Sequence, residues 1–285
     1  MLIQSEKKKI PILMYHSISQ STNPKFKQFS VPPTLFAEHM AYLYQHDYTT
    51  LSATQFIQIR VQGKDKLPER SVLVTFDDGF ADFFTEALPV LRWYGFVATL
   101  YITTAFINGT SLWMQHEGET THSMLTWDQL LEINKCGIEI GAHSHSHPQL
   151  DILPLSLARD EIVRCKRLLE DKLSQEVWSF AYPHGYHSAA IQRLVREAGY
   201  TSACAVKYEM NTETTDPFAL ARLKMSSDTS VDALATLLTM RCPLPITTLY
   251  KRARIPVWRL VRRFSNLRGQ NLQASGSAAS TIGLR

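Results

Sequence analysis

The chain has 285 residues, of which 45% are hydrophobic and 20% are charged. This balance supplies enough apolar side chain for a sizeable buried core, and it excludes a wholly disordered chain, a collagen-like protein and a coiled coil. The net charge is +4, but nine of the 30 basic residues and none of the 26 acidic residues follow Asp232, so the main body is mildly acidic and the tail is strongly basic.

Targeting and redox features are sparse. The four cysteines lack the spacing of a structural zinc site or a disulfide framework, so we expect them to be small core residues. The N-terminal lysines are not followed by the apolar run of a secretory signal, and no segment reaches the roughly 18 apolar residues of a membrane span. We therefore expect a cytoplasmic protein.

In chain order, short apolar runs alternate with longer helical patterns, which is typical of βα units and a parallel sheet. Strands are predicted at 10–15, 48–51, 71–76, 98–103, 138–142, 177–182, 201–206 and 220–225. Helices are predicted at 33–45, 82–94, 127–135, 155–173 and 188–198. About seven or eight parallel strands favour an α/β fold built as a distorted (β/α) barrel.

Two adjacent carboxylates follow the third predicted strand. The sequence VLVTFDDGF places Asp77 and Asp78 at the exit of a buried strand, before a glycine that permits a tight turn. Neighbouring carboxylates repel each other unless a cation or a proton lies between them. The pair therefore indicates a metal site, with an ordinary turn and helix cap as the alternative.

Three alternating histidines follow the fifth predicted strand. In IEIGAHSHSHPQL these are His143, His145 and His147, a pattern that is unusual for core packing and frequent around a single cation. Two imidazoles and one carboxylate would leave open positions on a divalent metal, as in catalytic sites. The remaining carboxylate could act as a base, so hydrolysis of an amide or ester is the expected reaction.

An amine leaving group also needs a proton donor. His16, in PILMYHSIS, directly follows the first predicted strand, and the carboxyl ends of parallel strands lie on one face of a barrel. We therefore expect His16 to lie near the aspartates and histidines and to act as the general acid.

Several motifs in order resemble a known family. TFDDG, LTWDQL, EIGAHSHSHP and FAYPHG are similar to the polysaccharide deacetylases of carbohydrate esterase family 4, the NodB-homology domain. The resemblance implies a catalytic domain over 8–232 with a distorted (β/α) barrel. It also implies removal of N-acetyl groups, or sometimes O-acetyl groups, from sugar polymers with a divalent metal. The metal is commonly zinc, although Co²⁺, Ni²⁺ or Mn²⁺ would suit the same ligands.

The family motifs also imply individual roles. Asp77 matches the catalytic base, while Asp78, His143 and His147 match the metal ligands, which leaves His145 as a neighbour. The N-terminal MYHSI resembles a circularly permuted subgroup typified by deacetylases of poly-N-acetylglucosamine, in which the histidine at the position of His16 is the acid.

The third family motif departs from its usual form. R-x-P-[YF] is present as residues 181–184, Ala-Tyr-Pro-His, so the arginine that normally positions the base is absent. Arg222 on the last predicted strand could substitute for it in space. His184 occupies the tyrosine position and would contribute its backbone N–H to an oxyanion hole.

These departures leave two alternative functions. The missing arginine motivates a catalytically silent barrel that only binds a glycan. The basic extension at 233–285, together with the expected lack of a secretory signal, motivates a deacylase of a lipid-linked or nucleotide-linked sugar. The extension is expected to be partly disordered and could contact the inner face of an anionic membrane. No nucleic-acid partner is expected, and the sequence does not specify an oligomeric state.

Overall fold

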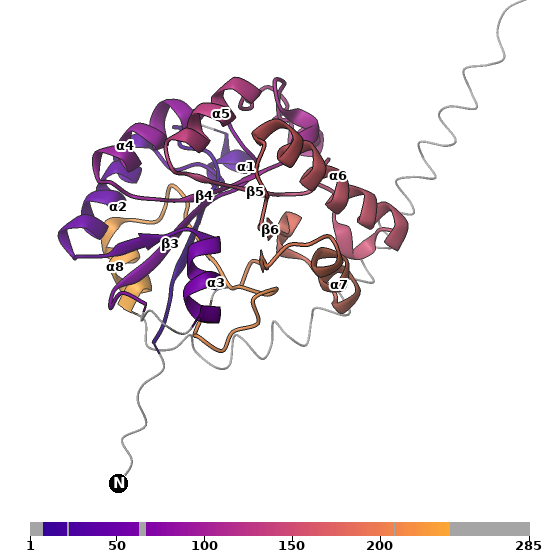
Figure 1. The fold of residues 1–285 in the computed structure, drawn as a ribbon. Coiled ribbons are helices and arrows are strands. Elements are labelled where there is room, and N and C mark those ends of the chain that lie inside the picture. Colours follow the sequence, from indigo (N-terminus) through magenta and orange to yellow (C-terminus); the bar gives the residue numbers. More distant parts are fainter. Residues whose placement is uncertain (1–7, 22, 63–66, 208, 240–285) are drawn as a thin grey trace, which may run out of the picture.

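Eight parallel strands form the centre of the molecule. The computed structural model describes residues 8–21, 23–62, 67–207 and 209–239, and every pairing between its named strands is parallel (Figure 1). The strands are β1 (Ile12–Tyr15), β2 (Thr49–Leu51), β3 (Ser71–Phe76), β4 (Thr99–Ile102), β5 (Glu139–Ala142), β6 (Ser179–Ala181), β7 (Ser202–Cys204) and β8 (Leu223–Lys224).

The strands are arranged as a distorted barrel. Neighbouring strands run β7-β6-β5-β4-β3-β1-β8, and β2 pairs with the first half of β3. An isolated parallel bridge between Cys204 and Leu220 links the end of β7 to the segment that leads into β8. The predicted distorted (β/α) barrel is confirmed.

Helices cover the outside of the sheet. The ribbon in Figure 1 shows α2, α4, α5, α6 and α7 around the strands. The α-helices are α1 (Pro24–Lys27), α2 (Pro33–Gln45), α3 (Ala53–Gln62), α4 (Leu88–Trp93), α5 (Trp127–Lys135), α6 (Leu155–Leu173), α7 (Ala189–Glu197) and α8 (Val231–Thr239). A π-helical segment, η1 (Phe83–Ala87), precedes α4, and four 3-10 turns lie in the loops: η2 (Thr104–Phe106), η3 (Leu112–Glu117), η4 (Leu150–Ile152) and η5 (Pro183–Gly185).

Alternation along each strand separates two apolar clusters. In β1, Leu13 and Tyr15 pack in the larger cluster under the outer helices, whereas Ile12 belongs to a smaller cluster inside the barrel. Tyr101 of β4 and Phe56 of α3 join Ile12 in that inner cluster. Successive strand residues point to opposite faces, so a residue that follows an outward one points inward. The same alternation decides which residues beyond the strand ends point into the barrel.

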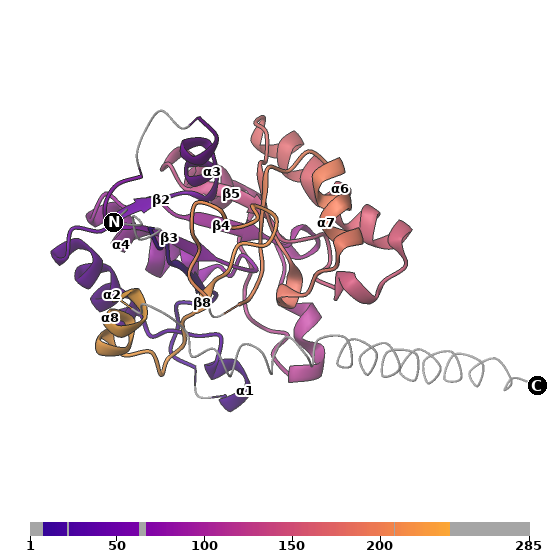
Figure 2. The same ribbon diagram turned by 90° about the horizontal axis from the view of Figure 1, so that it is seen from below.

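Most predicted elements agree with these bounds, although β6, β7 and β8 are shorter than the predicted strands 177–182, 201–206 and 220–225. All eight predicted strands are present, and α2, α5 and α6 begin and end at the predicted residues. Three helices, α1, α3 and α8, were not predicted. In Figure 2 α8 lies beside α2, and the imidazole of His39 in α2 bonds the carbonyl of Thr229 just before α8 at 2.8 Å.

Two expectations concern other parts of the chain. Helix α8 crosses residue 232, the expected end of the catalytic domain. Most of the basic extension, from residue 240 onward, lies outside the described residues. None of the helices in the described ranges is long and apolar enough to cross a membrane.

Candidate metal and active site

Strand register brings the first two site segments together. Tyr15 of β1 lies opposite Phe76 of β3, and both belong to the outer cluster. The next residues, His16 and Asp77, therefore leave the two strands side by side and face inward. The Asp77 amide donates a hydrogen bond to the Tyr15 carbonyl at 3.0 Å, which keeps the two strand ends in register.

The histidine loop leaves the sheet in the same way. Ala142, the last residue of β5, pairs with Ile102 of β4 and with Phe180 of β6. His143 follows it and is buried, with its Nδ1 donating a hydrogen bond to the carbonyl of Ala181 at 2.8 Å. This bond turns Nε2 toward the aspartates and fixes the tautomer that a metal ligand needs.

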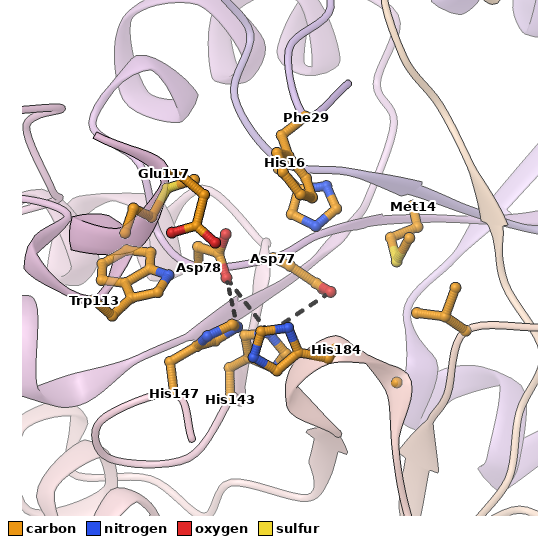
Figure 3. A pocket seen from close by; sticks show the side chains of 13 residues that line it. Met14, His16, Phe29, Asp77, Asp78, Trp113, Glu117, His143, His147 and His184 are labelled. Atoms are coloured by element: carbon orange, nitrogen blue, oxygen red, sulfur yellow. Dashed lines mark ion pairs between the residues drawn. The ribbon is translucent and has the colours of Figure 1, made fainter. Parts of the chain in front are cut away.

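Asp78, His143 and His147 form a cluster of potential metal ligands. Asp78 Oδ1 lies 3.4 Å from His143 Nε2 and 3.3 Å from His147 Nε2, and the three donor atoms lie within 4.8 Å of one another (Figure 3). Asp78 Oδ1 is buried and makes no hydrogen bond. An unpartnered buried carboxylate oxygen facing two imidazole nitrogens fits a divalent cation with mixed N and O ligands.

The pKa shifts of Asp78 and His147 agree with this fit, whereas burial would lower the pKa of His143 but Asp77 and Asp78 outweigh it and raise it. Burial alone would raise the pKa of Asp78, but His143 and His147 hold it well below its usual value. Burial lowers the pKa of His147 well below that of a free imidazole, and this outweighs the attraction of Asp78. A charged carboxylate and a neutral imidazole are the forms that bind a metal.

Asp77 belongs to a different pair. Its two carboxylate oxygens accept hydrogen bonds from both terminal nitrogens of Arg222, at 2.6 and 2.7 Å. Both side chains are buried, Arg222 completely. Burial would raise the pKa of Asp77, yet the guanidinium of Arg222 outweighs it and keeps the pKa low. The third family motif lacks its arginine, and the sequence suggested Arg222 as a substitute. The structure shows that Arg222 contacts Asp77, the residue that this arginine would position.

The backbone around the site is strained. Of the seven non-glycine residues with positive φ in the described ranges, four lie in these loops: Asp78, Ser144, His147 and His184. Such conformations cost about 1–3 kcal/mol each and persist where surrounding structure imposes them. Gly79 has φ +89°, and a Cβ there would lie 2.9 Å from the side chain of Ile102. The turn after the two aspartates therefore needs a glycine.

His16 and His184 complete the wall of one pocket. The pocket is lined by Met14, His16, Phe29, Asp77, Asp78, Trp113, Met114, Glu117, His143, His147, His184, Gly185 and Val206. In Figure 3, His16 and His184 lie on opposite sides of the aspartates. The His184 ring is 4.7 Å from that of His147, and Phe29 meets the His16 ring edge-on at 5.3 Å.

His145 is not part of the cluster. Its Nδ1 lies 2.9 Å from the hydroxyl of Thr104, and it is not among the clustered donor residues Asp78, His143 and His147. All six residues predicted for the site, His16, Asp77, Asp78, His143, His147 and His184, thus line one pocket, and their roles remain predictions.

Sequence reasoning missed Glu117 and Phe29 as pocket residues. Glu117 ends η3 in the long loop after β4, and Phe29 follows α1. Neither stands in a family motif or follows a predicted strand. The only available signal was the length of the loop, because long loops often border a site.

The ligand loop has its own support. Glu161 of α6 accepts hydrogen bonds from the backbone N–H and the hydroxyl of Ser146, at 2.7 and 2.6 Å. We expect Glu161→Ala to weaken zinc binding about tenfold, because groups that hold ligands in place contribute about that much to affinity. Zinc titration would measure it, with exposed Asp160→Ala as the control. Equal affinities of the two variants would contradict the prediction.

Known proteins resemble the chain in both sequence and fold. A family model described as polysaccharide deacetylase matches residues 64–203. The Bacillus subtilis protein YxkH, named as a polysaccharide deacetylase, is 31% identical over 81% of this chain and 77% of its own length. A poly-beta-1,6-N-acetyl-D-glucosamine N-deacetylase of Staphylococcus aureus is 23% identical over 73% of this chain and 72% of its own.

Two solved structures share the fold. A Streptococcus pyogenes deacetylase, PplD, solved with acetate, has a TM-score of 0.71 at 23% identity and covers 82% of this chain and 100% of its own. IcaB from Ammonifex degensii has a TM-score of 0.70 at 21% identity, over 82% and 98% of the two chains. The chain belongs to the polysaccharide deacetylase family, of the carbohydrate esterase family 4 (NodB-homology) type, and is a hydrolase of carbon–nitrogen bonds other than peptide bonds.

Proposed function

We propose that the protein removes N-acetyl groups from an N-acetylglucosamine-containing polysaccharide, in a metal-dependent reaction with an aspartate base and a histidine acid. One observation carries the proposal. Asp77 is paired to Arg222 and stays outside the cluster of Asp78, His143 and His147, although it lines the same pocket. The name of the Staphylococcus aureus relative supports this choice of glycan.

The base is the first role. Asp77 is buried, and its low pKa keeps it as a carboxylate that can accept a proton from the attacking water. A divalent metal, most simply zinc, held by Asp78, His143 and His147 would polarise the acetyl carbonyl and the water. Arg222 holds both oxygens of Asp77 and so fixes the direction in which the base acts.

The acid and the oxyanion donor are the remaining roles. His16 lines the pocket across from His184, where it can give a proton to the departing sugar amine. The backbone N–H of His184 would stabilise the negative charge that develops on the acetyl oxygen. Acetate and a glucosamine unit are the products.

An acetate-release assay tests this function. Purified protein with Zn²⁺ should release acetate from an N-acetylglucosamine oligomer, and Asp77→Asn should lower kcat/KM by about 10²–10⁴-fold, the usual contribution of a general base. Asp77→Asn should retain bound zinc, since Asp77 is not a proposed ligand. Exposed Asp171→Asn on α6 is the matched control. No acetate from the wild-type protein on a panel of acetylated glycans would reject the proposal.

The structure also bears on the motives for the two alternative functions. The motive for a silent binding barrel was the missing arginine, and the pairing of Arg222 with Asp77 removes that motive. One motive for a lipid-linked or nucleotide-linked substrate was the basic extension, which from residue 240 lies outside the described residues. Among the described residues, neither alternative has a structural observation in its favour, and the polysaccharide named for the Staphylococcus aureus relative remains the proposed substrate.

A further inference from the structure

We propose that Asp82 is a positioning residue for the acid His16. The proposal rests on the function proposed above and adds a residue to which no role has been assigned. Asp82 begins the helical segment that follows the two aspartates, five residues after Asp77. Its carboxylate anchors the two residues that come directly after His16.

The contacts of Asp82 are directed at the His16 loop. Asp82 Oδ2 accepts a hydrogen bond from the hydroxyl of Ser17 at 2.5 Å, and Oδ1 accepts one from the backbone N–H of Ile18 at 3.1 Å. Ser17 and Ile18 are completely buried. The carboxylate therefore joins the loop that carries the acid to the loop that carries the base.

Asp82 does this in place of an ordinary local role. It is the N-cap residue of η1, where an aspartate usually accepts hydrogen bonds from the first helical N–H groups. Its side chain makes no such bond and instead reaches residues 64 and 65 positions earlier in the chain. Burial of the carboxylate also raises its pKa, despite the hydrogen bonds from Ser17 and Ile18.

His16 depends on the contacts of Asp82 because the Nδ1 atom of its own ring makes no hydrogen bond with the described residues. His16 Nδ1 is buried and has no hydrogen-bond partner, in contrast to His143, whose Nδ1 is held by a carbonyl. The ring position is therefore set by the backbone and by its contact with Phe29. Ser17 also fixes that contact, because its N–H donates to the Phe29 carbonyl at 3.1 Å.

A comparison of two substrates tests the role. An N-acetylglucosamine oligomer has an amine leaving group that needs a proton, whereas 4-nitrophenyl acetate releases a phenolate that does not. We expect Asp82→Ala to lower kcat on the oligomer about 10–100-fold, because a misplaced acid loses most of its contribution, with KM changed by less than about threefold. Ester hydrolysis and zinc content should stay within about twofold of wild type.

A double-variant cycle with His16→Ala separates positioning from a general structural role. If Asp82 acts through His16, adding Asp82→Ala to His16→Ala should cost less than about a further twofold on the oligomer. Asp82→Asn should retain most activity, since its amide oxygen can accept from Ile18 and its NH₂ can donate to the Ser17 hydroxyl. Asp171→Ala is the matched control.

The outcomes are distinct. Equal losses on both substrates, or the same loss with and without His16, would overturn the role of Asp82, as would full oligomer activity of Asp82→Ala. If Asp82→Ala does not fold, Ser17→Ala removes the 2.5 Å contact, and the same substrate comparison and cycle decide the question with that variant. A wild-type protein that hydrolyses neither substrate would reject the proposed function itself, and the role of Asp82 with it.

Discussion

Replacing Arg222 with methionine is expected to lower the free energy of unfolding by about 3–5 kcal/mol, the usual cost of removing one partner of a buried ion pair. Arg222 is completely buried, and its guanidinium donates to both oxygens of Asp77. Without it, Asp77 would keep a buried charge with no cation beside it. Urea unfolding of the metal-free protein at pH 7 would measure the change.

Asp77→Asn provides the matched control for this prediction. In the Arg222→Met background it removes the stranded charge, so the double variant should recover part of the lost stability. Arg222→Lys should fall between, because a single ammonium keeps the charge but cannot donate to both oxygens in the fork geometry of arginine. If the free energy of unfolding of Arg222→Met lies within 1 kcal/mol of the wild-type value, the ion pair of Arg222 and Asp77 does not stabilise the fold as predicted.

Loss of Arg222 should also reduce catalysis. The pKa of Asp77 would rise toward the value that burial alone imposes, and its carboxylate would lose the contacts that orient it. We expect kcat/KM on an N-acetylglucosamine oligomer to fall about 10²-fold, as for other misplaced catalytic groups. Activity equal to wild type in a folded Arg222→Met protein would show that the family's third-motif arginine has no replacement in this chain.

The fold could be predicted because the strands carry strong local signals. Runs such as Ser71–Phe76 are mostly apolar, buried on both faces and followed by the turn residues of DDG. Helix α3 carried a misleading signal, because Ile57, Ile59 and Val61 alternate with polar residues in the two-residue period of a strand. Helix α1 has only four residues, too few for a period to be visible.

The site could be predicted where it depends on strand ends. His16, Asp77 and His143 each follow the last residue of a parallel strand, and such ends meet on one face of a barrel. The contact of Arg222 with Asp77 spans 145 positions and depends on how β8 pairs with β1, which no local pattern specifies. The contacts of Asp82 with Ser17 and Ile18 span 65 and 64 positions, and no local pattern specifies them either.

Among the substitutions considered, removal of a proposed ligand is expected to weaken zinc binding the most. Asp78→Asn removes the negative charge of the cluster and His147→Ala removes one of its three donors, so we expect zinc affinity to fall by more than about 10²-fold and acetate release to drop below detection. A chelator should abolish wild-type activity, and added Zn²⁺ should restore it. Metal analysis of the purified variants, together with zinc titration, would measure the loss independently of activity.

His145→Ala is the matched control for this experiment. His145 lies two positions from each histidine of the cluster, but its ring contacts the hydroxyl of Thr104 and is not one of the clustered donor groups. It should therefore bind zinc with nearly wild-type affinity, and saturating zinc should raise its unfolding free energy as it does for wild type, by about 4 kcal/mol at a thousandfold excess over Kd. If His145→Ala lost zinc as completely as His147→Ala, the proposed set of metal ligands would be wrong. Only the positions of the side chains distinguish His145 from the two proposed ligands His143 and His147.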